Sequence, residues 1–481
     1  MILIFMSSIA SASATEDNLT HIASDLDDCL DEASPIHVNA NADGQGNGSE
    51  QSPYSSLNQA IHSSLNDSTI ILEEGTYKGS SNTQITISKD LTIEGRGNVV
   101  IDGENKYSFF KIMPKTSLTL KNIRFINGYT NDYSQLAIIN NNGDLKIDKC
   151  LFNNIEGIFG CILNQKNLIL TNTTISNSKA LNMAQAVTNL GNCTIADSKL
   201  SSTPVNSYLD VSATVYNYKN LNMANSRIDE LDSNSNYDDV SYETPDILID
   251  NSLINQLNID DARVTITNSE INNRVIFRNL NINITGSRFN QASSIIGLSI
   301  HYCNLTSYHN TFNCDISSGY NNLNITYCAI LGNMYGGGKY DNLYAPYNWW
   351  GINSGPSLSY FKNYNVSYWA VATFEYENAS IPINPTGEFI VSLNKWSDGT
   401  NTHDFGVGES LPLRHASFEA QSGKFESDYK PLIGSTTNHL IANTVDGKAY
   451  AIVDRQRMVL NIGNSISNST YYLSPEGHDG A

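Results

Sequence analysis

The sequence predicts an all-β protein, in which a right-handed parallel β-helix of about twelve coils with an N-terminal capping helix is followed by a small antiparallel Ig-like β-sandwich. Three observations predict this fold. Short apolar strands recur between Ile70 and Ile330, and a small polar residue precedes nearly all of them. After Trp369 the repeat gives way to short alternating runs between turn signals. An antiparallel sandwich or a propeller for the repeat region is the rival interpretation, but it expects hairpin dipeptides and longer periods.

Each repeat has the same register. An apolar anchor residue is followed by a second apolar residue two positions later, a small residue at position +5 and a bulky apolar residue at position +7, as in Leu145, Ile147, Cys150 and Phe152. The spacing of the anchors averages about 23 residues, which is typical of a solenoid whose coils bury their inward residues against their neighbours. The anchors are Ile70, Leu91, Leu118, Leu145, Leu168, Cys193, Leu221, Ile247, Val264, Ile282, Leu305 and Leu323.

The residue before each anchor tests this register independently. These pre-anchor residues are Thr69, Asp90, Ser117, Asp144, Asn167, Asn192, Asn220, Asp246, Arg263, Asn281, Asn304 and Asn322, so all but Arg263 are Asn, Asp, Ser or Thr. Such residues tolerate left-handed backbone angles and hydrogen-bond their own turns. We therefore expect a similar turn in every coil and a ladder of stacked amides.

A stack of coils has an open sheet edge at each end, so both ends need a cap. Upstream, Pro53 precedes Leu57, Ala60, Ile61 and Leu65 at helical spacing, which predicts a short amphipathic helix with Pro53 at its first position. Downstream, residues 336–338 are three glycines, and the Asn-Trp-Trp-Gly motif at 348–351 follows them. We expect the two indoles to close the last coil.

These signals divide the chain into seven segments. The expected segments are a signal peptide (1–14), a linker (15–35), an N-terminal cap (36–69), the parallel β-helix (70–335), a C-terminal cap (336–370), the sandwich (371–470) and a tail (471–481).

Charge and the N-terminus restrict the functional class. The 481 residues carry 28 Lys+Arg against 48 Asp+Glu, a formal net charge of -20, which disfavours binding to nucleic acid. Residues 1–14 are apolar and end in Ala12-Ser13-Ala14, the pattern of a signal peptidase site. Since no later segment is apolar enough to span a bilayer, we expect a secreted or cell-surface protein whose mature chain does not insert into the membrane.

The sequence predicts no catalytic residues, no metal site and no cofactor. Its seven cysteines lack any Cys-x-x-Cys spacing and are expected to be packed thiols. Asn39, Asn41 and Asp43 imitate a calcium loop but lack the acidic first ligand and the flanking helices. They are interpreted as part of a Gly-rich loop before the first strand.

Several motifs together resemble a known family. Glu74-Gly75-Thr76-Tyr77 and Leu91-Thr92-Ile93-Glu94-Gly95 are similar to the first coils of pectin-lyase-fold β-helix proteins. With the Asn-Trp-Trp-Gly motif and the following sandwich, the chain resembles the adhesin-like surface proteins of methanogenic archaea. The resemblance implies an archaeal cell-surface protein that binds envelope or host glycans or proteins through the faces of the β-helix.

The alternative is a secreted polysaccharide lyase or glycoside hydrolase of the pectin-lyase fold, because fold alone does not decide function. Binding is favoured, since the sequence offers no obvious catalytic pair. Asp246 and Arg263 are expected to form a salt bridge between coils instead. The sequence does not indicate an oligomeric state.

Aromatic residues are the candidate glycan contacts. Trp349 and Trp350 are candidates for stacking on sugar rings, with burial in the cap as the other interpretation. Tyrosines that project from adjacent coils would also suit a binding face. Examples are Tyr237, Tyr242, Tyr302, Tyr308 and Tyr327.

Overall fold

A computed structural model gives the fold of the chain. It describes residues 34–203, 213–234, 244–291, 297–336, 340–356, 363–376, 386–441, 447–462 and 471–472. The predicted signal peptide, nearly all of the predicted linker, Cys29, Tyr237, Tyr242 and most of the predicted tail lie outside the described residues.

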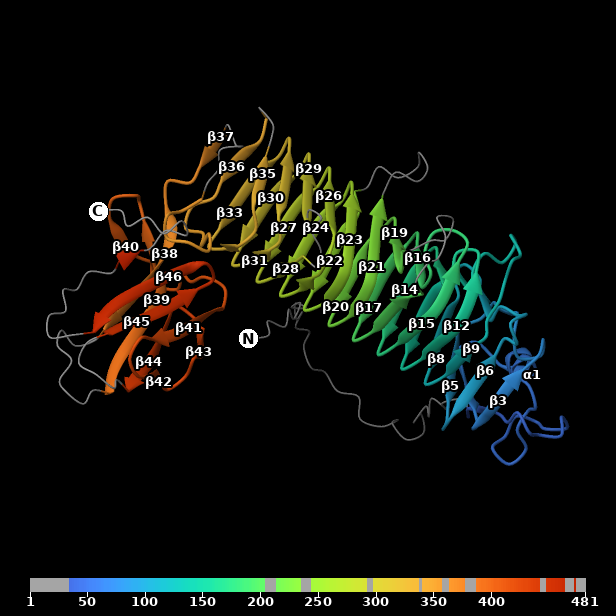
Figure 1. The fold of residues 1–481 in the computed structure, drawn as a ribbon. Coiled ribbons are helices and arrows are strands. Elements are labelled where there is room, and N and C mark those ends of the chain that lie inside the picture. The colour runs from blue at the N-terminus through green and yellow to red at the C-terminus, as the bar shows by residue number, and fades with distance from the viewer. Residues whose placement is uncertain are drawn as a thin grey trace, which may run out of the picture. The chain divides into compact units, whose positions relative to one another are not determined.

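The predicted fold class is confirmed, because the chain is a parallel β-helix followed by an antiparallel β-sandwich. All twelve predicted anchors lie in one 15-stranded parallel sheet (Figure 1). Its strands are β1 (Ile36–Val38), β2 (Ser68–Leu72), β5 (Leu91–Gly95), β8 (Ser117–Lys121), β11 (Asp144–Asp148), β14 (Asn167–Thr171), β17 (Asn192–Ala196), β20 (Leu221–Ala224), β22 (Asp246–Asp250), β24 (Arg263–Thr267), β27 (Asn281–Thr285), β30 (Asn304–Tyr308), β33 (Asn322–Thr326), β36 (Asn342–Tyr344) and β37 (Asn363–Asn365).

The other strands of the coils form a 22-stranded parallel sheet. Two series of strands run through it and join at the long strands β21 and β23. Its strands are β3 (Gly75–Lys78), β4 (Ile85–Ile87), β6 (Val99–Asp102), β7 (Phe110–Ile112), β9 (Arg124–Ile126), β10 (Ile139–Asn141), β12 (Leu151–Gly157), β13 (Ile162–Asn164), β15 (Thr174–Ala180), β16 (Val187–Asn189), β18 (Lys199–Ser202), β19 (Val215–Asn217), β21 (Arg227–Asn234), β23 (Leu253–Asp260), β25 (Glu270–Ile271), β26 (Val275–Arg278), β28 (Arg288–Asn290), β29 (Leu298–His301), β31 (Thr311–Asn313), β32 (Ile316–Gly319), β34 (Ala329–Ile330) and β35 (Met334–Gly336).

The predicted ladder of amides exists on the exposed side of the 15-stranded sheet. The amide of Asn192 donates to Asn167 at 3.0 Å, and that of Asn220 donates to Asn192 at 3.1 Å. Arg263 and Asp246 form the expected intercoil salt bridge at 2.6 Å. The first pre-anchor prediction is wrong, because Ile70 pairs with Ile93 and not with the anchor Leu91. The equivalent position is two residues earlier, where Asp67 has a φ of 62°.

The structure also explains why a small residue recurs at position +5. In coil after coil its side chain is buried and accepts a hydrogen bond from the backbone amide of the same position in the preceding coil. The series runs through Thr173, Ser198, Ser226, Ser252, Ser269 and Ser287. Cysteines occupy the same position at Cys150 and Cys328, and the six cysteines in the described part of the chain are free and buried, as expected for packed thiols.

A second ladder of amide side chains, which was not predicted from the sequence, lies inside the β-helix. Asn141 donates to Asn164 at 2.7 Å, Asn164 to Asn189 at 2.6 Å, and Asn189 to Asn217 at 2.6 Å. All four side chains are fully buried. Since a buried polar group without a partner is costly, this ladder fixes how neighbouring coils superimpose.

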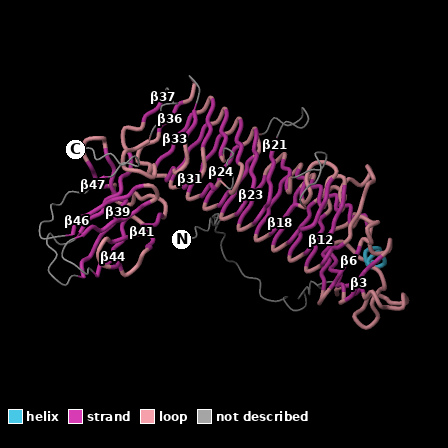
Figure 2. The backbone as a smooth tube through the Cα atoms, viewed as in Figure 1, coloured by secondary structure: helices cyan, strands magenta, loops and turns pink. Residues whose placement is uncertain are grey.

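The N-terminal cap contains the predicted helix, but with different bounds. Helix α1 (Leu57–Ser63) begins after Ser56, whose side chain caps it, so Pro53 is not its first residue (Figure 2). Leu57, Ala60 and Ile61 are buried as predicted. Leu65 lies beyond the helix and is exposed, because the helix ends at Ser63.

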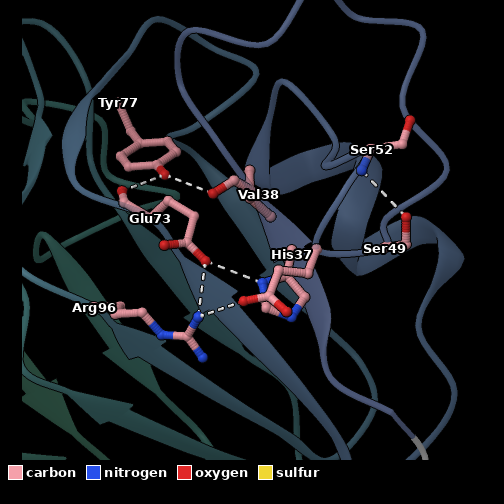
Figure 3. Close-up of polar contacts among 8 residues, drawn as sticks. His37, Val38, Ser49, Ser52, Glu73, Tyr77 and Arg96 are labelled. Atoms are coloured by element: carbon pink, nitrogen blue, oxygen red, sulfur yellow. Dashed lines mark hydrogen bonds and ion pairs between the residues drawn. The ribbon is translucent and has the colours of Figure 1, made fainter.

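A polar cluster ties the first coils together (Figure 3). Glu73 contacts His37 at 3.0 Å and Arg96 at 3.4 Å. The buried hydroxyl of Tyr77 lies 2.9 Å from the carbonyl oxygen of Val38 and 2.7 Å from that of Glu73, and its single proton is shared between the two acceptors. Desolvation raises the pKa of Tyr77, so its phenol stays neutral and keeps this proton. The cluster has a structural role in closing β1 onto β2 and β3.

The stacking extends beyond both ends predicted for it. Strands β1, β36 and β37 continue the 15-stranded sheet within the segments expected to be caps. Leu343 is a further anchor, because it pairs with Leu323. Asn348 then occupies position +5 and accepts from the amide of Cys328 at 2.8 Å, and Trp350 occupies position +7. The Asn-Trp-Trp-Gly motif is therefore part of one more coil.

The sandwich consists of two antiparallel sheets. One contains β38 (Trp369–Tyr376), β39 (Thr386–Ser397), β40 (Thr402–Asp404), β42 (Lys424–Phe425) and β44 (Ser435–Ile441), and the other contains β41 (Arg414–Ala420), β43 (Tyr429–Leu432), β45 (Gly447–Val453), β46 (Gln456–Ile462) and β47 (Tyr471–Tyr472). The division of the chain into independent domains stays a prediction.

The two indoles join the β-helix to the sandwich. Trp350 packs in the core of the β-helix, whereas Trp349 packs in the core of the sandwich. The Trp349 indole N–H donates to Asp454 at 2.7 Å, and the Arg455 guanidinium donates to the carbonyl of Trp350 at 2.8 Å. Both partners lie in the turn between β45 and β46.

The buried ladder should matter more for stability than the exposed one. Asn164→Ala leaves buried polar atoms of its neighbours without partners, so we expect it to lower the free energy of unfolding by about 2 kcal/mol or more. Asn192→Ala, on the exposed ladder, should cost less than about 1 kcal/mol because water replaces the lost bonds. Urea unfolding followed by circular dichroism measures both. Equal losses would contradict the role given to the internal ladder.

Trp350→Ala tests the extra coil. Truncating a buried indole should cost on the order of 3 to 5 kcal/mol, seen as a lower midpoint of thermal unfolding. Tyr344→Ala, at an exposed site in the same coil, is the matched control and should change stability by less than about 0.5 kcal/mol. An unchanged midpoint for Trp350→Ala would show that the indole is not part of the core.

Candidate functional site

The tryptophans predicted as glycan contacts are not available to a ligand. Trp349 is 0% exposed and Trp350 is 5% exposed, so neither indole presents a face to solvent. The stacking prediction is wrong because the motif continues the repeat, which places Trp350 at an inward position and Trp349 against the sandwich. Both residues are buried, as the other interpretation expected.

Tyrosines gather instead at the turns of the last coils. The chain turns with positive φ at two corners that flank the 15-stranded sheet. At the second corner, four residues after each anchor, the successive residues are Asn225, Asn251, Asn268, Gly286, His309, Tyr327 and Tyr347, with φ between 43° and 62°. Asn and Gly adopt this conformation readily, whereas a bulky residue does so at a cost of roughly 1–2 kcal/mol. The change to aromatic residues is thus confined to the coils near the sandwich.

The first corner, two residues before the pre-anchor position, shows the same change. Asp261 and Asn279 are followed in the next coils by Tyr302 and Tyr320, with φ of 57° and 63°, and then by Tyr340. The rings of Tyr302 and Tyr320 stack with centroids 5.0 Å apart, and those of Tyr320 and Tyr340 stack at 5.4 Å. All three are more than half exposed. Because each ring covers the next, the stack offers mainly ring edges and hydroxyl groups.

The tyrosines of the second corner pack against the sandwich. Tyr327 and Tyr347 stack at 5.2 Å, and Tyr347 and Tyr368 stack at 5.6 Å. Trp396 and Phe405 of the sandwich pack against this stack. Burial raises the pKa of the Tyr327 phenol, and a hydrogen bond to Glu409 raises it further. This corner is a structural joint.

Between the two corners, the outer face of the sheet is hollowed. This C-terminal hollow has a volume of about 660 Å³ and lies over β30, β33, β36 and β37. Its polar and aromatic lining residues are Asn304, Thr306, Asn322, Asn324, Asn342, Tyr344, Tyr364 and Asn365. None of its described lining residues is charged.

The amides of the C-terminal hollow keep bonding capacity for a ligand. Asn322 donates to Asn304 at 2.9 Å, and Asn342 donates to Asn322 at 2.8 Å. Each such bond uses one of the two N–H groups of an amide and one lone pair of its oxygen. The second N–H and the second lone pair remain for hydroxyl groups of a ligand.

Two rings in the hollow have open faces. Tyr344 is 49% exposed and Tyr364 is 54% exposed. In the described part of the chain, neither ring is stacked on another aromatic ring. An exposed phenol face suits the apolar face of a sugar ring, and its hydroxyl suits the sugar's polar edge.

Two acidic residues form a separate cluster on the 22-stranded sheet. Asp232 pairs in register with Asn258, and Asp260 lies two residues further along the same strand, so both face the same side. Burial raises the pKa of both carboxyl groups, and the neighbouring Asp261 raises that of Asp260 further. Arg278 is in register with Asp260, and His301 with Arg278.

No group of three or more His, Cys, Asp or Glu in the described residues is arranged to hold a metal ion. Asn39 and Asp43 accept hydrogen bonds from backbone amides two residues later, at 2.9 and 3.1 Å, as they do in ordinary polar turns.

The sequence predicted Tyr302 as a residue of a binding face, but it did not predict Tyr344 and Tyr364. A signal was present, because the sequences Tyr302-Cys303-Asn304, Tyr320-Asn321-Asn322 and Tyr340-Asp341-Asn342 place a tyrosine two residues before successive pre-anchor positions. Recognising the third as another coil would have put Tyr344 directly after an anchor, at an outward position.

Comparisons with known proteins return only distant structural likeness. No protein-family model matches the chain, and no curated protein matches it. Among solved structures, it is similar to XylC in complex with xylose, with 9% identity over 74% of this chain and 89% of that chain and a TM-score of 0.39. It is also similar to pectate lyase Pel9A, with 13% identity over 69% and 78% and a TM-score of 0.26, and to a GH87 alpha-1,3-glucanase catalytic domain with nigerose, with 11% identity over 65% and 66% and a TM-score of 0.28. The fold assignment therefore rests on the strand pairing of the chain itself.

Proposed function

We propose that the protein binds neutral glycans at the C-terminal hollow and acts as a surface adhesin-like protein. The observation that carries this proposal is the appearance of tyrosines at the left-handed corners beside this uncharged hollow. At the second corner, packing against the sandwich accounts for this costly backbone conformation, whereas the tyrosines of the first corner are exposed beside the hollow. Tyr302 and Tyr320 of the first corner are 60% and 51% exposed, so their hydroxyl groups are accessible to a ligand.

The chemistry of the hollow matches a neutral sugar. Amides and hydroxyls of Asn304, Thr306, Asn324 and Asn342 offer both donors and acceptors to sugar hydroxyl groups. Tyr344 offers an apolar ring face. A uronate would need a cation, and no Lys or Arg is among the described lining residues. The volume of about 660 Å³ lies within the usual range of ligand sites.

The expected cellular setting is part of the proposal. An archaeal, secreted or cell-surface protein would meet envelope or host glycans. None of the helices in the described residues has the length and hydrophobicity needed to cross a membrane.

A glycan array with neutral and acidic oligosaccharides tests the function. We expect wild-type protein to bind neutral glycans, and Tyr344→Ala with Tyr364→Ala to weaken that binding at least tenfold, because each removes an open ring face worth about 1 kcal/mol or more. Tyr133→Ala is the control, since Tyr133 is also an exposed tyrosine, at 82%, but lies in a loop before β10.

Two outcomes would contradict the proposed function. Retained binding in the double variant, with an unchanged melting temperature, would place the glycan elsewhere. Preference for uronates or sulfated glycans would contradict the match between the uncharged hollow and its ligand.

The carboxylate cluster supports a second candidate function, a glycoside hydrolase. The strand register places the Cα atoms of Asp232 and Asp260 about 8 Å apart. Inverting glycosidases hold their two carboxyl groups about 6.5 to 9.5 Å apart, so this Cα spacing, with both side chains on one side, is compatible with such a pair. A carboxyl with a raised pKa remains protonated to higher pH and can act as a general acid.

An assay for reducing ends and unsaturated products on neutral and uronate polymers decides between the two functions. We expect no turnover. Product release that is lost in both Asp232→Asn and Asp260→Asn, but retained in Tyr344→Ala, would replace the binding proposal with the enzymatic one. The Tyr344→Ala variant serves as the control because it leaves the carboxylates untouched.

A further inference from the structure

A second hollow lies on the same face as the C-terminal hollow. It has a volume of about 410 Å³ and lies over β8, β11, β14 and β17. Thr119, Lys146, Ile169 and Thr194 line it, and each follows an anchor directly. Asp144 lines it as well, so its two charged residues have opposite signs and the lining carries no net charge. We call it the N-terminal hollow. Thr306, Asn324 and Tyr344 hold the corresponding positions in the C-terminal hollow.

Strand pairing connects the two hollows by one column of outward residues. From Ile169 the register passes through Thr194, Asn222, Leu248, Thr265, Asn283, Thr306 and Asn324 to Tyr344 without interruption. Eight strand steps separate Ile169 from Tyr344, so the two side chains lie about 38 Å apart along the stack.

The column contains both polar and apolar groups. Ile169, Leu248 and Tyr344 are 41%, 46% and 49% exposed, and the residues between them are Thr and Asn. A polysaccharide chain also presents both kinds of group, because each sugar ring has an apolar face and a rim of hydroxyl groups. Exposed apolar side chains are individually ordinary, but two aliphatic side chains and one open tyrosine ring in one column on a hollowed face form a track.

We propose that the ligand is a linear neutral polysaccharide that lies along this column and occupies both hollows at once. This inference rests on the proposed glycan binding and specifies its ligand as an extended polymer. Once the C-terminal hollow holds one part of a chain, the N-terminal hollow meets the next part at a high effective concentration. Affinity should therefore depend on chain length with a threshold.

Isothermal titration with gluco-, xylo- and manno-oligosaccharides of graded length tests the threshold. Chains longer than about 38 Å should bind roughly 100-fold more tightly than short ones of the same sugar. Ile169→Asp should remove this gain and leave the affinity for short chains unchanged, because it alters only the N-terminal hollow. Leu181→Asp is the control, since Leu181 is exposed but lies outside the column, just after β15.

Each outcome either supports or contradicts the extended ligand. Tight binding of long chains that Ile169→Asp reduces and Leu181→Asp does not would support the extended ligand. If short and long chains bind equally well, or if the gain persists in Ile169→Asp, the extended ligand is wrong while glycan binding stands. If no chain of any length binds, the proposed function itself fails.

Discussion

The structure depends on one constraint, which is that every coil must turn at the same places as the coils beside it. In a parallel β-helix the backbone of one coil supplies the hydrogen-bond partners of the next, so a corner that shifts by one residue would turn buried side chains outward. Three sets of side chains enforce this alignment here. The exposed amides at the pre-anchor positions, the hydroxyls at position +5 and the buried asparagines from Asn141 to Asn217 each bond from coil to coil.

The same constraint explains what the sequence could predict. Alignment demands the same residue type at the same position in each coil, so the anchors and pre-anchor amides were visible without any structure. The internal ladder was also written in the sequence, because Asn141, Asn164, Asn189 and Asn217 each lie four residues before the next anchor. It was missed because the repeat was defined only from each anchor onward. The last coil was missed for another reason, since its small residue at position +5 is Asn348 and its bulky residue is Trp350, within a motif that suggested a cap.

The candidate site was predictable only in part. Exposed tyrosines on adjacent coils were anticipated, and Tyr302 belongs to such a stack. Which tyrosines serve the joint and which remain open depends on where the sandwich packs, and this follows from contacts such as Trp349 with Asp454 across 105 residues of sequence. Tyr327 and Tyr347 are therefore used by the fold, whereas Tyr344 and Tyr364 are left to solvent.

We propose above all that the uncharged, tyrosine-bordered end of the 15-stranded sheet is a binding surface. Hydroxyl-radical footprinting of the tyrosines, with and without a saturating neutral glycan, tests this most directly because it reports each ring separately. We expect the glycan to protect Tyr344 and Tyr364 and to leave Tyr133 and Tyr429 unchanged. Protection confined to residues near Asp232 and Asp260, or protection of none of these rings by a glycan that demonstrably binds, would contradict it.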